Sequence, residues 1–162
     1  LGDIWKHKYP DLMVISPDVG GVVRARALAK RLDDTDLAII DKRRSEHNKA
    51  KVYHVIGEVA GKNAIIVDDM IDTGGTISAG ADLLLEHGAV SVRAIAAHPI
   101  LSGPAVDRLN ASSFDEVLVS NSIPLSSAAE ESNKIVQLSV ASILGEAIRR
   151  IHDDESVSKM FE

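Results

Sequence analysis

Short apolar runs alternate with stretches of helical periodicity along most of the chain. The runs are rich in Val, Ile and Ala, which is typical of parallel strands buried on both faces. Helical stretches between such runs favour βαβ units. The expected fold class is α/β, an open and mostly parallel sheet flanked by helices. Strands are predicted over Leu12–Ser16, Leu37–Asp41, Val52–Ile56, Ala64–Val67, Val92–Ala97 and Glu116–Ser120, and helices over Val22–Arg31, Gly75–His87 and Gly103–Leu109.

The two ends of the chain also show helical patterns. A helix is predicted over Leu1–Tyr9, and apolar residues recur at helical spacing near the other end. We interpret that second stripe as core packing, in preference to a partner-binding face. Segments 42–51 and 125–134 have the composition of less ordered loops. The stripe comprises Val140, Ile143, Leu144, Ala147, Ile148 and Ile151.

Residues 64–77 carry the densest polar motif. The apolar run Ala64–Val67 leads into Asp68 and Asp69, and the Gly-rich turn Asp72–Thr76 precedes a predicted helix. Ligands of open α/β sheets bind beyond the carboxyl ends of the strands. Small residues at a helix N-terminus let backbone N–H groups approach an anion. The string indicates a phosphorylated sugar as ligand, and a plain strand with an Asp-rich turn is the alternative.

Carboxylates beside a phosphate site would repel the ligand unless they face its hydroxyl groups or a metal ion. Two ionised carboxylates can accept hydrogen bonds from the vicinal hydroxyls of a ribose. Mg²⁺ prefers oxygen ligands and would offset the remaining negative charge. The motif therefore predicts a ribose phosphate site.

A second turn of the same kind lies at residues 16–24. Asp18 follows a predicted strand, and Gly20 and Gly21 precede a predicted helix. Taken alone, this pattern is more typical of a plain connection between a strand and a helix. Its pairing with the motif at residues 64–77 favours a second anion site.

Three cations, Lys42, Arg43 and Arg44, follow the predicted strand Leu37–Asp41. Such runs are commonly solvated edges. Phosphoryl transfer, however, is catalysed mainly by positioning and by stabilisation of charge. A site with two anion-binding turns also needs positive charge near the transferred phosphoryl group. This cationic run is therefore a candidate for the catalytic loop.

The composition limits the kind of protein. The 162 residues fit one domain, 1–162, and the net charge of −6 argues against a nucleic-acid surface. No apolar stretch approaches the length of a membrane span, so no membrane role is expected. The chain has no cysteine and opens with no signal peptide, which favours a cytoplasmic enzyme. The six histidines lack metal-ligand spacing and are expected to be structural.

Val67–Thr76 resembles the ribose-phosphate signature shared by type I phosphoribosyltransferases and ribose-phosphate diphosphokinases. The resemblance implies a type I phosphoribosyltransferase-like fold. It also implies that the acidic pair holds the ribose hydroxyls and that the following loop holds the 5-phosphate. The residues so assigned to ribose 5-phosphate are Asp68, Asp69, Asp72, Thr73, Gly74, Gly75 and Thr76, together with Arg44 of the cationic run.

Other segments resemble the diphosphokinases in particular. Residues 97–105 and 120–124 are similar to segments of that family in the same chain order. Its diphosphate loop resembles Pro17–Gly21, which implies that Asp18, Gly20 and Gly21 bind diphosphate and that Asp18 also holds Mg²⁺.

Two further resemblances to this family concern catalysis and regulation. A Lys-x-Arg pattern on a mobile loop of the family matches Lys42 and Arg44, which implies catalytic roles for both. The tail resembles part of an allosteric phosphate or ADP site of regulated members, which implies roles for Ser156, Ser158 and Phe161. A short Ser-rich tail is also typical of a plain chain end.

The activity implied by the resemblance is transfer of the diphosphoryl group of ATP to the 1-hydroxyl of ribose 5-phosphate. The products are 5-phosphoribosyl 1-diphosphate, used in nucleotide biosynthesis, and AMP. The resemblance is to the second domain of a two-domain subunit that forms hexamers. We therefore expect part of a longer homo-oligomeric protein, inactive alone. A type I phosphoribosyltransferase and a non-catalytic regulatory paralogue remain alternatives.

Overall fold

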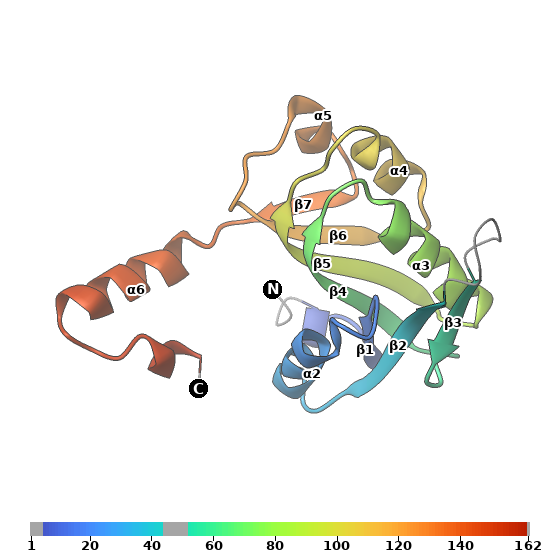
Figure 1. Ribbon diagram of the computed structural model, residues 1–162, viewed down its shortest axis with the longest axis horizontal. Coiled ribbons are helices and arrows are strands. Elements are labelled where there is room, and N and C mark those ends of the chain that lie inside the picture. Colours follow the sequence, from blue (N-terminus) through green and yellow to red (C-terminus); the bar gives the residue numbers. More distant parts are fainter. Residues whose placement is uncertain (1–4, 44–51, 162) are drawn as a thin grey trace.

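A seven-stranded sheet with helices on both faces forms the body of the protein (Figure 1). The computed structural model describes residues 5–43 and 52–161. The strand order is β3-β2-β1-β4-β5-β6-β7, and only the β2–β3 pair is antiparallel among these described strands. This confirms the expected α/β class. The strands are β1 (Leu12–Ser16), β2 (Asp36–Arg43), β3 (Val52–Ile56), β4 (Asn63–Ile71), β5 (Ser91–Pro99), β6 (Glu116–Ser120) and β7 (Ile135–Leu138).

The helices divide between the two faces of the sheet. Figure 1 shows α3, α4 and α5 over one face and α2 over the other. Each face has its own buried aliphatic cluster, so the central strands are apolar on both sides. No described helix has the length and apolar character needed to span a membrane. The helices are α2 (Val22–Arg31), α3 (Gly75–Glu86), α4 (Ala105–Ala111), α5 (Ser127–Glu130) and α6 (Ala141–His152), with a short 3₁₀ turn at Ser158–Met160.

Strand β4 is longer than the predicted run. It continues through Asp68 and Asp69 to Ile71, because Met70 and Ile71 still pair with His98 and Pro99 of β5. The acidic pair therefore lies inside the last part of the strand and not after it. A rigid sheet position holds these carboxylates more firmly than a loop would.

The sequence pattern missed the edge strand β7 and the short helix α5. β7 has only four residues, of which Val136 and Gln137 are exposed, so it lacks the apolar signature of the central strands. The helix α5 lies inside the segment predicted as a loop, residues 125–134, where the Ser126 side chain caps it by accepting from the Ala129 N–H.

The first described residues anchor the N-terminal segment on the sheet. Residues 5 and 6 are helical, in agreement with part of the helix predicted over 1–9. Trp5 is fully buried, and its Nε1 donates to Glu116 Oε2 at 2.9 Å. The Tyr9 ring lies 3.5 Å from the Arg93 guanidinium carbon, a cation–π contact. This segment covers β5 and β6 on the same face of the sheet as α2.

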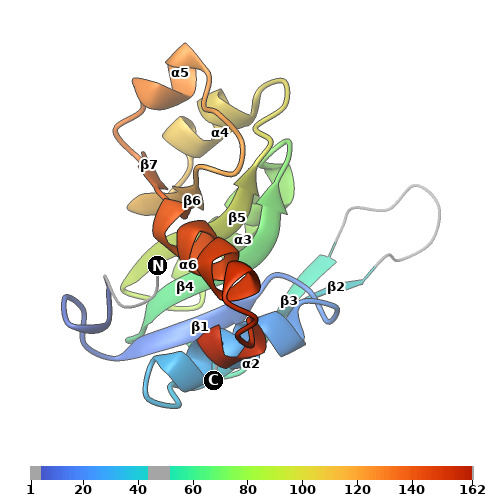
Figure 2. The same ribbon diagram turned by 90° about the vertical axis from the view of Figure 1, so that its left-hand side faces the viewer.

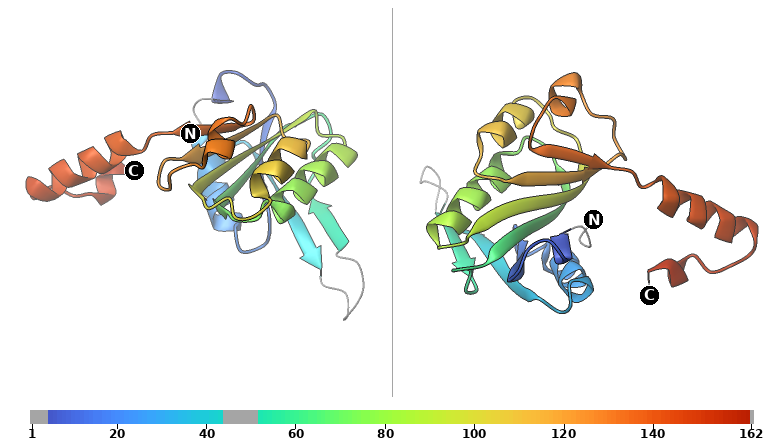
Figure 3. Two further views of the ribbon diagram at one scale, coloured as in Figure 1. Left: turned by 90° about the horizontal axis from the view of Figure 1, so that it is seen from above. Right: turned by 180° about the vertical axis from the view of Figure 1, so that it is seen from behind.

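The prediction that the stripe of α6 packs into the core is wrong. None of the twelve residues of α6 is buried, and its large aliphatic side chains are between 49% and 68% exposed. The helix follows β7, the last strand of the sheet, and leaves the body there (Figure 3). The described part of the chain therefore offers it no sheet face to cover.

Candidate functional site

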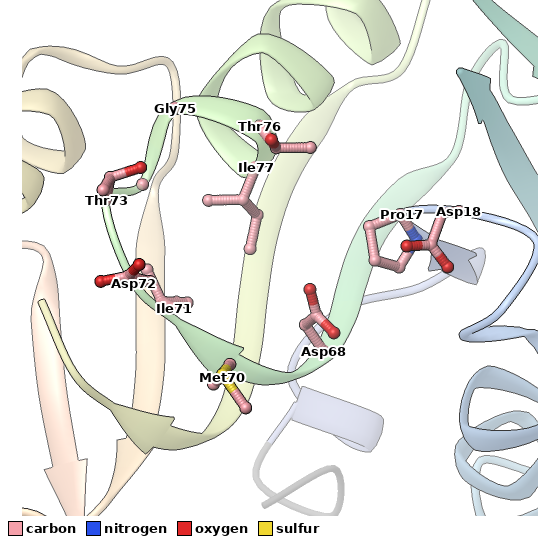
Figure 4. Close-up of a pocket in the computed structure, with 11 residues that line it drawn as sticks. Pro17, Asp18, Asp68, Met70, Ile71, Asp72, Thr73, Gly75, Thr76 and Ile77 are labelled. Atoms are coloured by element: carbon pink, nitrogen blue, oxygen red, sulfur yellow. The ribbon is translucent and has the colours of Figure 1, made fainter. Parts of the chain in front are cut away.

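A pocket of about 270 Å³ lies where the parallel strands β1 and β4 end side by side. The turn after β1 and the turn after β4 both open into it, as Figure 4 shows. Parallel neighbours end at the same edge of a sheet, so two motifs about 50 residues apart in the chain meet there. The predicted residues that line the pocket are Asp18, Asp68, Asp72, Thr73, Gly74, Gly75 and Thr76.

The turn Asp72–Thr76 runs directly into the N-terminus of α3. Gly74 has φ +73°, a left-handed conformation that glycine adopts without strain, and its carbonyl accepts from Ser78 N at 3.0 Å. The first N–H groups of a helix have no partner within the helix and suit an anion. Ser102 fixes the start of the turn, because its N–H donates to the Asp72 carbonyl and its hydroxyl donates to Asp72 Oδ1.

The turn after β1 is fixed by its own side chains. Asp18 Oδ1 accepts from the Gly21 N–H at 2.8 Å, and the buried Ser16 hydroxyl donates to the Asp18 carbonyl at 2.7 Å. A Cβ at Gly21 would lie only 2.9 Å from Ser16 Oγ, so a larger residue there would force the Ser16 hydroxyl to shift. Asp18 itself is exposed at the pocket.

The acidic pair is bridged by Arg24 of α2, a residue that the sequence analysis left without a role. Its Nη1 lies 2.9 Å from Asp68 Oδ1 and its Nη2 lies 3.0 Å from Asp69 Oδ2. Burial raises the pKa of Asp68, whereas the hydrogen bond from the Asp68 carboxyl, and then Arg24, lower the pKa of Asp69. Arg24 thus compensates the repulsion that adjacent carboxylates would exert on each other and on a phosphate.

A second missed cation, Arg108 of α4, reaches the phosphate turn. Its Nη1 donates to the Thr73 carbonyl at 2.9 Å and would lie 3.6 Å from a Cβ at Gly75. Arg108 lies 32 positions from Thr76 in the chain, so only the packing of α4 beside α3 brings it there. Its exposed guanidinium adds a positive charge at the mouth of the turn.

The donor set is suited to a divalent cation that shares its ligands with a phosphate. Among the described residues, no group of three or more His, Asp or Glu side chains is arranged to hold a metal. Mg²⁺ is usually held by one or two carboxylates together with substrate phosphates and water. The exposed carboxylate of Asp18, fixed through its Oδ1, fits that requirement.

Several predicted residues lie elsewhere. Arg44 and the side chain of Lys42 lie outside the described residues, although the Lys42 backbone pairs with Tyr53 in the β2–β3 hairpin. Asp69 lies beside the pocket and contacts Arg24. The predicted allosteric residues, Ser156, Ser158 and Phe161, lie on the tail beyond α6, where the two serine hydroxyls are 2.8 Å apart.

Comparison with known proteins agrees with this geometry. Residues 42–162 match the family model of the phosphoribosyl synthetase-associated domain. The chain belongs to this family. The matched residues include the acidic pair and the phosphate turn but begin after the Asp18 turn, so they contain one of the two turns at the pocket.

Individual relatives match nearly the whole chain, including residues that precede the range matched by the family model. A ribose-phosphate pyrophosphokinase of Xylella fastidiosa is 59% identical over 162 residues, 99% of this chain and 50% of the relative. The crystal structure of phosphoribosylpyrophosphate synthetase from Mycobacterium smegmatis has a TM-score of 0.83 at 38% identity, covering 94% of this chain and 48% of that one. The chain thus spans about half the length of the relatives it matches.

A more distant structure shares the fold alone. The purine phosphoribosyltransferase from Pyrococcus horikoshii has a TM-score of 0.52 at 24% identity, covering 64% of this chain and 71% of that one. Together with the mycobacterial enzyme it confirms the type I phosphoribosyltransferase-like architecture that the sequence resemblance implies.

Proposed function

We propose that this chain is the ribose 5-phosphate-binding domain of a ribose-phosphate diphosphokinase. The observation that carries the proposal is the meeting of two glycine-containing turns and Asp68 in one pocket at the ends of β1 and β4, with Asp69 beside it. A reaction that joins a sugar phosphate to a diphosphate needs adjacent sites for both anions. The relatives named ribose-phosphate pyrophosphokinase support the same activity.

The proposed reaction joins the 1-hydroxyl of ribose 5-phosphate to the β-phosphorus of ATP. The new bond forms from the hydroxyl oxygen, the bond between the β-phosphorus and the oxygen shared with the α-phosphorus breaks, and AMP leaves with that oxygen. The hydroxyl proton passes to solvent. No covalent intermediate on the protein is required, so catalysis depends on positioning and on charge.

Each part of the pocket has a role in this scheme. Asp68 and Asp69 would accept from the 2- and 3-hydroxyls of the ribose, and the turn Asp72–Thr76 would bind the 5-phosphate. The turn Asp18–Gly21 would bind the diphosphate. Lys42 and Arg44 would stabilise the charge of the passing phosphoryl group. Arg44 would also contact ribose 5-phosphate.

Mg²⁺ is the proposed cofactor, and Asp18 is the residue proposed to hold it. The ion would supply charge neutralisation on the diphosphate when bound. The fixed, exposed carboxylate of Asp18 supports this assignment. Asp18 Oδ1 accepts from the Gly21 N–H, so the other carboxylate oxygen of Asp18 would be the one to meet the ion.

The longer protein is proposed to have two similar domains, of which this is the second. The half-length coverage of the relatives supports a longer protein, and the sequence resemblance to the second domain of the family supports the order of the domains. The remaining domain would bind the adenine of ATP, and the whole would be a cytoplasmic hexamer. Ser156, Ser158 and Phe161 would contribute to an allosteric site between subunits.

An activity assay tests the proposal. The full-length protein that carries this chain, incubated with ATP, Mg²⁺ and ribose 5-phosphate, is expected to release AMP in equal amount to phosphoribosyl diphosphate. The 162-residue chain alone is expected to release none. Release of AMP by the chain alone would contradict the assignment of ATP binding to the remaining half.

Calorimetry on the 162-residue chain tests the site itself. Asp68→Ala is expected to weaken ribose 5-phosphate binding by about tenfold to a hundredfold, since a hydrogen bond to a charged group contributes about 1.5–3 kcal/mol. Glu86→Ala is the matched control, because it removes the same charge from the exposed far end of α3. Equal affinity of the Asp68 variant and the unmodified chain would refute the assignment.

A further inference from the structure

Arg24 lies where the two turns of the pocket come closest to each other through the acidic pair. The helix α2 packs on β1 and β4, as Figure 2 shows, and Arg24 belongs to its first turn. The guanidinium lies 2.9 Å from Asp68 Oδ1 and 3.0 Å from Asp69 Oδ2, and its Nη1 would lie 3.6 Å from a Cβ at Gly21. One cation thus contacts the acidic pair and also borders the turn after β1.

The contacts with the acidic pair leave N–H donors of Arg24 for another ligand. A guanidinium carries more N–H donors than the two contacts with Asp68 and Asp69 engage. The Arg24 side chain is 38% exposed, so a ligand that enters from solvent can reach it. Its planar fork matches the geometry of phosphate oxygens. The remaining donors therefore suit a phosphate group beside the acidic pair.

The turn after β1 keeps the space next to Arg24 free of side chains. Gly20 and Gly21 stand between Asp18 and the helix, so no side chain separates the turn backbone from the guanidinium. Asp18 Oδ1 accepts from the Gly21 N–H at 2.8 Å and fixes the turn in this form. An anion bound at the N-terminus of α2 would therefore meet the Arg24 side chain as well as the backbone.

A diphosphate on this turn would also face a carboxylate. Asp18 and Asp68 line the same pocket, and Figure 4 shows Asp68 between the Asp18 side of the pocket and the turn Asp72–Thr76. Negative charges so close to one another repel unless a cation lies between them. Arg24 has the position and the charge to reduce that repulsion, because it already contacts Asp68 and borders the turn at Gly21.

We propose that Arg24 binds the diphosphate directly and shares its guanidinium between the diphosphate and the acidic pair. This inference rests on the proposed function, because it takes the turn Asp18–Gly21 as the diphosphate site. Arg24 would then link the carboxylates that hold the ribose hydroxyls to the diphosphate that is joined at the 1-position. The alternative is that Arg24 acts on Asp68 and Asp69 alone, which would serve the ribose and not the diphosphate.

A comparison of two ligands tests the inference. Ribose 5-phosphate lacks the diphosphate, whereas phosphoribosyl diphosphate carries it on the same ribose. Calorimetry on the 162-residue chain, at constant Mg²⁺, measures the affinity for each. Arg24→Gln is expected to weaken phosphoribosyl diphosphate binding by about tenfold more than it weakens ribose 5-phosphate binding, since a charged hydrogen bond to the diphosphate is lost in addition. Arg24→Lys is expected to recover part of this additional loss, because it keeps the charge.

The ratio of the two affinities is the decisive quantity. A general loss of stability would weaken both ligands alike and leave the ratio unchanged, so the ratio reports on the diphosphate contact. Arg26→Gln is the matched control, because it removes the same charge from the exposed side of α2 and is expected to keep the ratio of the unmodified chain. An equal loss for both ligands in Arg24→Gln, or a smaller loss for phosphoribosyl diphosphate, would overturn the inference.

The unmodified chain separates this inference from the proposed function. If the unmodified chain binds neither ligand, the proposed ribose site is wrong and the inference is overturned with it. If it binds both ligands and Arg24→Gln lowers the two affinities by the same factor, the proposed site stands and only the role of Arg24 toward the diphosphate is overturned.

Discussion

Arg24 Nη1 lies 2.9 Å from Asp68 Oδ1, which ties the first turns of α2 to the end of β4. The two residues are 44 positions apart in the chain. The contact brings a guanidinium next to carboxylates that would otherwise repel an anionic ligand and each other. It makes Arg24 part of the site, as a residue that positions the acceptors and favours their ionised form.

Arg24→Gln is predicted to weaken ribose 5-phosphate binding by about fivefold to tenfold. Loss of the pair costs about 1 kcal/mol, because these side chains are partly exposed and screened. Arg24→Lys is expected to restore only part of the affinity, since a lysine cannot bridge two carboxylates with a planar fork. Calorimetry with Arg26→Gln, on the exposed side of α2, as the control gives the comparison. Tighter binding by Arg24→Gln would show instead that Arg24 blocks the acceptors.

Ribose 5-phosphate affinity is predicted to depend on pH through Asp68. Burial raises the pKa of Asp68, so its carboxylate is lost at a higher pH than that of an ordinary aspartate. Affinity should fall as the pH drops through this raised pKa. Arg24→Gln removes a charge that lowers the pKa, so the midpoint should move to higher pH. A midpoint that Arg24→Gln leaves unchanged would contradict the coupling.

The same pKa shift predicts the sign of a stability change. A carboxyl with a raised pKa in the folded state stabilises the fold below its unfolded pKa, and this contribution is lost as the pH rises through the folded pKa. Asp68→Asn should therefore gain stability relative to the unmodified chain at pH 7 and lose that advantage at acidic pH. Thermal unfolding at both pH values measures it; an advantage that is the same at both would count against the shift.

Arg108→Gln is predicted to weaken ribose 5-phosphate binding by about tenfold. The guanidinium at the Thr73 carbonyl is placed to contact the bound phosphate, and a charged hydrogen bond is worth about 1.5–3 kcal/mol before solvent screening. Arg108→Lys should retain part of the affinity, and Lys30→Gln on the exposed side of α2 controls for net charge. Competition by inorganic phosphate should weaken in parallel; an unaffected phosphate affinity would remove Arg108 from the site.

Gly74→Ala and Gly61→Ala form a matched pair. Both glycines have left-handed φ values, +73° and +75°, so alanine should cost about 1 kcal/mol of folding stability at either position. Only Gly74 belongs to the phosphate turn. A Cβ at Gly61 would meet no described atom within 4 Å, so alanine there would disturb no neighbouring group. Both variants should unfold at similarly lowered temperatures, but only Gly74→Ala should lose ribose 5-phosphate binding. Loss of binding in both would mean that stability, and not the turn, sets the affinity.

The sequence by itself determined the central sheet and the chemistry of the two turns. Apolar runs such as Leu12–Ser16 and Glu116–Ser120 are buried on both faces, so their composition alone marks them as strands. The turn at Asp72 was predicted from its own residues, whereas the turn at Asp18 was predicted as an anion site only because it is paired with that motif. These patterns depend on residues that are neighbours in the chain, so they can be interpreted before the tertiary packing is known.

Only the tertiary structure decided which residues complete the pocket and which faces stay uncovered. Arg24 and Arg108 are ordinary helix cations in the sequence and enter the site because α2 and α4 pack beside it. The extension of β4 to Ile71 depends on pairing with β5. The spacing of apolar residues in α6 predicted an amphipathic helix but not the surface that its apolar side contacts. That surface depends on which other elements the fold places beside the helix. In the described residues, no part of the sheet reaches that face.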